Sequence, residues 1–336
     1  MVIKQLIILT SLCLCACGKT ELENEWQKYP DRIANLTASE FTPVEPPNYY
    51  PVNQNQYRQA IEPIEINLIK ALSIQDCQLQ NFIGERNSSL GKVHSPSNRL
   101  IYEKKLLDAL NFCSELTQSA EAALLTKIKT HKQNNWPKQV NNYLIEAEPV
   151  QAFYQQTHTL LENDTAGFNT SLEFINALTP LITPDSTKPL TQPQFNRFEN
   201  SVAQIYNRKF ISQLFYTLEY TQNQLAQVNK MLTSQAQKQV CTDSFTPVEI
   251  TYLHNVFIKY YAHILQPHLT KLNSISSQIA PKIDYLFAHS QIQRSPFGQR
   301  YLTNQPQSVY YSFNQSIQKH TQLWQQIFKQ CGLMPK

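Results

Sequence analysis

Glycine is scarce in this chain, and that scarcity limits what it can fold into more than any other feature. Only 6 of the 336 residues are Gly, whereas 19 are Pro and fall mostly between long stretches with apolar residues at helical spacing. So few glycines leave little material for tight hairpins or phosphate-binding loops. We therefore predict an all-α protein, an irregular multi-helix bundle of long helices kinked at prolines, with enough chain for a substantial core.

Apolar residues at three- and four-residue steps mark the expected helices. We predict helices over residues 20–38, 54–85, 99–132, 167–178, 191–239, from 246 onward and 309–331, with two shorter ones between 136 and 161. The steps slip near Phe210, which indicates a bend, and a kink is expected at Pro267. Thr246 and Glu249 form a capping-box pattern. Prolines and polar residues predict an extended segment over 41–52, a turn over 86–98 and a loop over 290–305.

The N-terminus has the pattern of a bacterial lipoprotein signal. An uncharged, mostly apolar run follows Lys4 and ends at Ala16, too short for a bilayer span but suited to a signal peptide. Leu14-Cys15-Ala16-Cys17 resembles the lipobox, in which the cysteine thiol carries a diacylglycerol. We predict a signal peptide over 1–16, lipidation at Cys17, a tether with a short helix over 17–52 and one helical domain over 53–336. The alternatives are an ordinary cleaved signal peptide or a buried hydrophobic strand.

The predicted anchor also predicts the compartment. Three acyl chains, as this class carries, hold a protein on a membrane almost irreversibly. Gly18 stands where an inner-membrane retention signal usually has Asp, so resemblance to the class implies the outer membrane, facing the periplasm. The membrane is thus one expected partner, and an envelope protein is another. Despite a net charge of +4, no Lys/Arg cluster is present, so nucleic acid is not an expected partner.

Four cysteines remain after Cys17. Cys77, Cys113, Cys241 and Cys331 in an oxidising periplasm predict two disulfides, for which three connectivities exist. We favour Cys77 with Cys113, across an expected helical hairpin, and Cys241 with Cys331, where one helix begins and the returning helix ends. These cysteines contain no Cys-x-x-Cys pair, so a metal is not expected, and no cofactor is predicted either.

Several segments resemble a known family. They are Trp26–Leu36 with its Tyr-x-x-Arg-Ile-Ala-Asn run, Asp76-Cys77, Glu85–Val93 with its Arg-Asn-Ser-x-Leu-Gly-Lys-Val run, Tyr102-Glu103 and Cys113. Together they resemble a family of uncharacterised proteobacterial lipoproteins, over nearly the whole mature chain. The resemblance implies an envelope lipoprotein with a helical fold, and it brings no activity and no catalytic residues.

Two polar groups of residues are candidate binding sites. The first is the turn of Arg86, Asn87, Ser88 and Lys92, where Arg86 offers a planar fork to a carboxylate or phosphate. The structural alternative is a helix C-terminus, with Arg86 facing the negative end of the helix dipole.

The second group is Tyr29, Arg32 and Asn35 on the short helix beside the predicted anchor. These residues either dock a partner or belong to a helix that packs back on the body of the protein.

Other chemistry has weaker support in the sequence. His254, His263 and His268 lie nine and five residues apart, whereas metal-binding histidines on one helix face need three or four. We expect no catalytic residues and favour a non-enzymatic envelope scaffold or partner-binding protein. The alternative is a module that binds a small glycan, lipid or peptide in an aromatic-lined cleft between helices. An envelope hydrolase is a third hypothesis, because carboxylates far apart in sequence can meet in a helical fold.

Overall fold

The protein is all-α, as predicted. A computed structural model describes residues 20–43, 45–74, 78–113, 122–183, 188–238, 241–242 and 245–334. Its α-helices are α1 Glu21–Thr37, α2 Gln54–Tyr57, α3 Leu68–Ser73, α4 Leu79–Asn87, α5 Ser89–Lys92, α6 Pro96–Cys113, α7 Ala122–Glu146, α8 Glu148–Gln151, α9 Thr165–Ile182, α10 Gln192–Ile205, α11 Phe210–Gln237, α12 Val248–Val256, α13 Gln266–Phe287, α14 Pro296–Tyr301 and α15 Val309–Gln330. A π-helix, η3, spans Phe257–Leu265, and the 3-10 helices η2 Ala152–Tyr154 and η4 Gln291–Arg294 follow α8 and α13.

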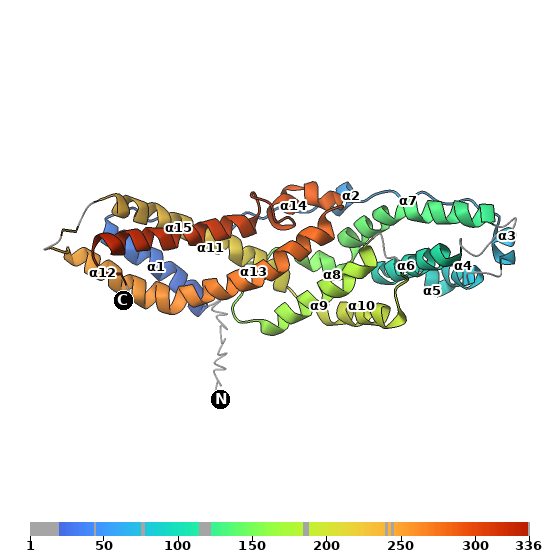
Figure 1. Cartoon of the computed structure of the whole chain (residues 1–336), viewed down its shortest axis with the longest axis horizontal. Helices are drawn as coiled ribbons and strands as arrows, with labels where there is room; N and C mark the ends of the chain where they lie inside the picture. Colours follow the sequence, from blue (N-terminus) through green and yellow to red (C-terminus); the bar gives the residue numbers. More distant parts are fainter. Residues whose placement is uncertain are drawn as a thin grey trace, which may run out of the picture.

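The helices form an elongated bundle, with most of them running along its length (Figure 1). One half contains α1, α11, α12, α13 and α15, and the other half contains α4 to α7, α9 and α10. A large apolar core extends through most of the molecule. Its residues are spread along the sequence from Trp26 in α1 to Phe328 in α15. A smaller core near the other end joins α4, α6 and α7 through Leu79, Leu106 and Ile128.

The predicted helix over 54–85 is wrong, because most of its first half is extended. Between α1 and α3 the chain is irregular except for the single turn α2, and we call this segment, residues 38–67, the strap; residue 44 is not described. Ile64 and Ile66 alternate with polar residues and pack on the smaller core. This two-residue period belongs to an extended chain. Pro63 further disfavours a helix through the strap.

Two other long predictions are each divided into two helices. The stretch 99–132 belongs to α6 and α7, which pack against each other. The stretch 191–239 holds α10 and α11, and Asn207 between them takes a left-handed conformation with φ of 59°. Such a residue ends a helix, so the slip near Phe210 marks a break where we expected a bend.

The prolines and the caps behave differently from the prediction at three places. Pro267 lies in the first turn of α13, directly after the π-helix η3. A change from π-helix to α-helix therefore stands where we expected a proline kink. Helix α12 has Pro247 as its N-cap without a side-chain hydrogen bond, so the Thr246 and Glu249 capping box is absent. The predicted polar loop over 290–305 contains η4 and α14.

The disulfide between Cys241 and Cys331 is confirmed. It joins the segment before α12 to the end of α15, with the two Cα atoms 5.2 Å apart. The pairing of Cys77 with Cys113 stays a prediction, because Cys77 and the side chain of Cys113 lie outside the described residues. The same holds for the signal peptide and for Cys17.

Candidate functional site

Helix α1, which carries the candidate residues nearest the predicted anchor, is part of the core. A capping box between Thr20 and Glu23 starts it. Tyr29 is fully buried, and its ring stacks on that of Tyr261 in η3 at 5.8 Å between centroids. Tyr29 therefore has no surface with which to dock a partner, and the alternative of a helix packed back on the body is correct.

A continuous chain of hydrogen bonds holds Tyr29 in place. The Trp324 indole Nε1 donates to the Tyr29 hydroxyl at 3.0 Å, and that hydroxyl lies 2.9 Å from His320 Nε2. His320 Nδ1 lies 2.8 Å from Asn229 Oδ1, and Asn229 Nδ2 donates to the carbonyl of Ser316 at 3.0 Å. The Asn229 amide is thus oriented with its oxygen toward the imidazole. This assigns the proton of a neutral His320 to Nδ1 and leaves Nε2 to accept from Tyr29.

Burial controls the protonation of this network. Removal from water lowers the pKa of His320 to about 3, and it raises the pKa of Tyr29 well above its usual value. Both side chains are consequently neutral throughout the physiological range. Every polar atom of His320 has a partner within the core, so the network serves to fix α1 rather than to hold a ligand.

Arg32 and Asn35 are exposed on the outer side of α1. The Arg32 guanidinium lies over the ring of Tyr260, 4.7 Å from its centroid, and Asn35 donates to Asp31 at 3.4 Å. Tyr29 points inward, so the structure does not bring these three predicted residues together as one surface.

The Arg86 turn lies at the opposite end of the molecule from α12, where α4 meets α5 (Figure 1). Arg86 Nη1 donates to the carbonyl of Gly91 at 2.9 Å, Asn87 donates to the carbonyl of Ile83 at 2.8 Å, and Ser88 caps α5 through the N–H of Gly91. A Cβ on Gly91 would lie only 2.0 Å from the carbonyl oxygen of Glu85, so the turn requires glycine here. Lys92 in α5 is exposed. These contacts support the helix-end interpretation of the turn.

A groove lined by aromatic and polar residues runs between α1, the strap and α11. It measures about 1250 Å³ with its open mouth, and Phe41 of the strap and Tyr220 of α11 line it. Tyr216 and Tyr220 stack there with ring centroids 6.1 Å apart. Gln224 is 3% exposed, and its Oε1 has no hydrogen-bond partner among the described residues. The sequence suggested an aromatic-lined cleft between helices without locating it, although the i,i+4 spacing of Tyr216 and Tyr220 on a helix was an available signal.

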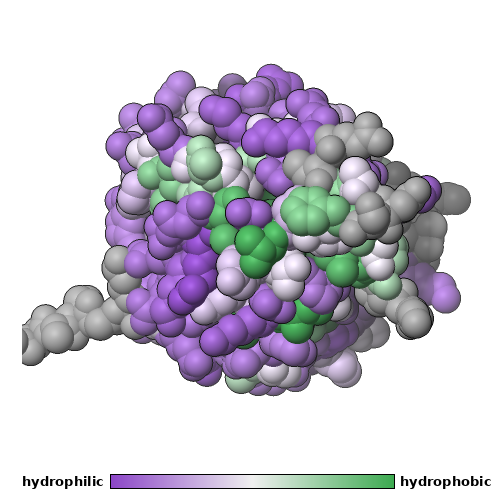
Figure 2. Space-filling view, turned by 90° about the vertical axis from the view of Figure 1, so that its left-hand side faces the viewer, coloured by the Kyte–Doolittle hydropathy of each residue, from purple (hydrophilic) through white to green (hydrophobic). Residues whose placement is uncertain are grey.

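An exposed apolar patch occupies the end of the molecule where α12 begins and α15 ends. We call it the end patch, and its members are exposed by 63% at Phe245, 54% at Val248, 52% at Tyr252 and 45% at Met334. Figure 2 looks onto this end and shows hydrophobic side chains gathered among hydrophilic ones. The disulfide between Cys241 and Cys331 ties together the two segments that carry the patch.

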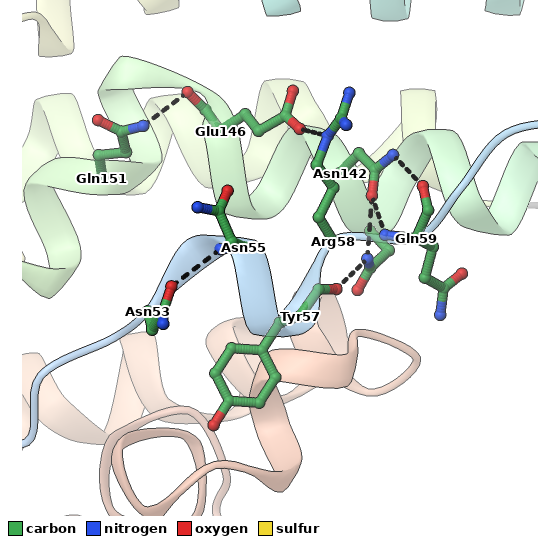
Figure 3. Close-up of polar contacts among 9 residues, drawn as sticks. Asn53, Asn55, Tyr57, Arg58, Gln59, Asn142, Glu146 and Gln151 are labelled. Atoms are coloured by element: carbon green, nitrogen blue, oxygen red, sulfur yellow. Dashed lines mark hydrogen bonds and ion pairs between the residues drawn. The ribbon is translucent and has the colours of Figure 1, made fainter.

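The strap is fixed to α7 by side chains that bind its backbone (Figure 3). Asn142 accepts from the N–H of Gln59 and donates to its carbonyl, both at 2.8 Å. Asn141 donates to the carbonyl of Tyr57 at 2.9 Å, and Arg58 forms an ion pair with Glu146. The two asparagines do what a neighbouring strand does in a sheet, which explains why an extended segment is stable in a helical protein.

The part of the chain that the structure describes contains neither a metal-ligand cluster nor a membrane-spanning helix. There, no three His, Cys, Asp or Glu side chains gather as metal ligands. The described helices also include none with the length and apolar character needed to span a bilayer.

Comparison with known proteins places the chain in a family. Residues 26–335 match the family described as "Protein of unknown function (DUF3080)". Neither the curated proteins nor the solved structures give a match. The family match begins within α1, at Trp26, and runs past the end of α15, so it includes both apolar cores. The chain therefore belongs to the DUF3080 family, whose members have no assigned function.

Proposed function

We propose that this protein is a lipid-anchored, non-enzymatic binding protein of the bacterial envelope. Lipidation at Cys17 holds it on the outer membrane facing the periplasm, and the end patch binds an envelope protein. The lipobox pattern supports the anchor. Burial of His320 and Tyr29 in a closed network supports a structural rather than a catalytic use of the most strongly perturbed groups.

The end patch is the observation that carries the proposal. Contiguous exposed apolar side chains on a soluble surface mark sites of protein interaction. The disulfide fixes the two segments of the patch before any partner arrives, which reduces the ordering cost of binding. The Arg86 turn is a weaker candidate, since its polar groups are used within the turn.

Site-specific photocrosslinking in living cells tests this proposal. A photoreactive amino acid at Val248 should give one discrete crosslinked product with an envelope protein, because this side chain is 54% exposed within the end patch. The matched control is the same amino acid at Leu90 of α5, which is 78% exposed beside the Arg86 turn. If only Leu90 gives a product, the partner binds at the Arg86 turn and not at the end patch. If neither position gives a product, partner binding is contradicted.

The groove favours a second candidate function, binding of a short oligosaccharide. Stacked tyrosines present flat apolar faces that suit a sugar ring, and Gln224 supplies a buried acceptor without a partner. Glu23 and Asp31 at the rim offer acceptors for hydroxyl groups.

Calorimetric titration with chitotetraose and maltotetraose tests this second function. Tyr220→Ala should weaken binding at least tenfold, because it removes half of the stacked pair. Tyr252→Ala removes a tyrosine outside the groove and should leave affinity unchanged. If the wild-type protein binds neither sugar, or if Tyr220→Ala binds as tightly as the wild type, the groove is not a glycan site.

A further inference from the structure

A second cavity lies between the strap, α6 and α7. It is small: the space inside it is about 30 Å³, and it reaches about 340 Å³ only with the open solvent at its mouth included. Arg58 lines it from the strap, Arg99 from the first turn of α6, and Gln139 and Tyr143 from α7. The cavity adjoins the contacts by which Asn142 and Glu146 hold the strap (Figure 3).

Arg99 carries a charge that no ion pair among the described residues balances. Its side chain is half-buried, and Nε is shielded from solvent without a hydrogen bond. Among the described residues, no carboxylate lies within ion-pair distance of Arg99. A shielded guanidinium N–H without an acceptor is costly, and such groups in native proteins require an explanation.

Tyr143 provides a second unused donor in the same cavity. It is 3% exposed, and its hydroxyl makes no hydrogen bond of ordinary geometry. Burial raises the pKa of Tyr143, an effect that the nearby Ser97 side chain opposes, so the hydroxyl keeps its proton. The ring is fixed by an edge contact with Phe198, at 6.1 Å between centroids. The hydroxyl is therefore held where it lies.

The remaining groups at the cavity give it a small positive excess. Glu146 is neutralised by Arg58, which leaves Arg99 as the uncompensated charge. Pro96 also lines the cavity, so α6 begins there and contributes the positive end of its dipole. The half-buried Gln139 adds a side-chain amide with no hydrogen bond of its own among the described residues.

We propose that this cavity binds a small monocarboxylate, held by the Arg99 guanidinium and the Tyr143 hydroxyl. Both unused groups can donate a hydrogen bond, which fits an acceptor ligand. A carboxylate presents two oxygens in the plane that a guanidinium fork matches. Its single negative charge balances the single unpaired arginine, whereas a phosphate monoester carries nearly twice that charge.

The test measures binding of N-acetylalanine to the purified full chain by calorimetric titration. Its neutral amide and inorganic phosphate are the comparison ligands. We expect N-acetylalanine to bind and its amide to bind at least tenfold more weakly, because the amide lacks the charge that pairs with Arg99. Arg99→Gln should weaken binding at least tenfold, and Tyr143→Phe several-fold. Arg294→Gln, which removes an exposed arginine that does not line this cavity, should leave the affinity unchanged.

A thermal melt separates this role from a purely structural one. Without ligand, Tyr143→Phe should melt at the wild-type temperature or above, because it removes an unsatisfied buried hydroxyl. With N-acetylalanine present, only the wild type should gain its full stabilisation. If Arg99→Gln does not fold, Arg99→Lys keeps the charge but loses the fork, and weaker binding is still expected. Equal binding of acid and amide, a preference for phosphate, or unchanged binding by the folded variants overturns the proposal.

Discussion

Replacing Cys241 and Cys331 together with serine should lower the free energy of unfolding by about 4 to 5 kcal/mol. The bond closes a loop of 90 residues that contains α12, η3, α13, α14 and α15. In the chain-entropy view, a crosslink over so long a loop strongly limits the unfolded ensemble, and the stabilisation grows with loop length. Because Cys241 is buried beside the end of α15, its loss also loosens the segment that carries the end patch.

Urea unfolding at pH 7, followed by tryptophan fluorescence, measures this effect. The double serine variant should unfold at a clearly lower urea concentration than the wild type. Reductant should lower the unfolding midpoint of the wild type by at least as much. A further drop of the variant in reductant would indicate the second predicted disulfide, between Cys77 and Cys113. A double variant within about 1 kcal/mol of the wild type would contradict the expected contribution of the loop.

Helices with one strong apolar face were predicted correctly from the sequence. The helix expected over 309–331 is α15, and the one over 20–38 is α1, each with a clear apolar stripe and a capping residue at its start. The Cys241 pairing was predictable for the same reason, since it joins the ends of two such elements.

The strap was not predictable from local spacing. Residues 54–67 contain enough apolar side chains to suggest a helix, but their backbone is held by Asn141 and Asn142 from α7, about 80 residues away in sequence. A long-range partner of this kind leaves no periodic signal in the segment that it binds. The cavity between Arg99 and Tyr143 escaped prediction for the same reason, because it exists only where strap, α6 and α7 meet.

The polar network around His320 did leave a signal that sequence reasoning overlooked. His254, His263 and His268 share a stretch of chain and so stood out as possible metal ligands. His320 instead lies on the apolar face of α15, seven residues after Phe313 and four before Trp324. A lone polar residue on such a stripe indicates a buried side chain with its partners elsewhere in the core.

The largest pH effect on stability should come from His320. Its pKa is about 3 in the folded protein, where burial disfavours the charged form, and near 6.5 when the chain is unfolded. Between these values the unfolded state binds a proton that the folded state does not, so stability falls as the pH is lowered through this range. At pH 4.5 the loss from this one group is about 2 to 3 kcal/mol relative to pH 7. His268, whose pKa burial lowers to about 4, acts in the same direction.

Comparing the wild type with His320→Gln at both pH values isolates this effect from that of other groups. At pH 7 the variant should be less stable by about 2 to 4 kcal/mol, because the bonds to Tyr29 and Asn229 are lost or distorted. At pH 4.5 that difference should shrink by about 2 to 3 kcal/mol, since only the wild type has a histidine there to protonate. His263→Gln, which removes an exposed histidine of η3, is the control for the substitution itself.

The same comparison tests whether the folded His320 is neutral. A neutral His320 that donates through Nδ1 and accepts through Nε2 agrees with the fixed Asn229 amide and with donation from the Tyr29 hydroxyl. If the stability difference between wild type and His320→Gln is constant from pH 7 to 4.5, the folded imidazole takes up its proton as easily as the unfolded one. Tyr29 would then have to accept from Nε2, and α1 would be held by a charged hydrogen bond in place of a neutral one.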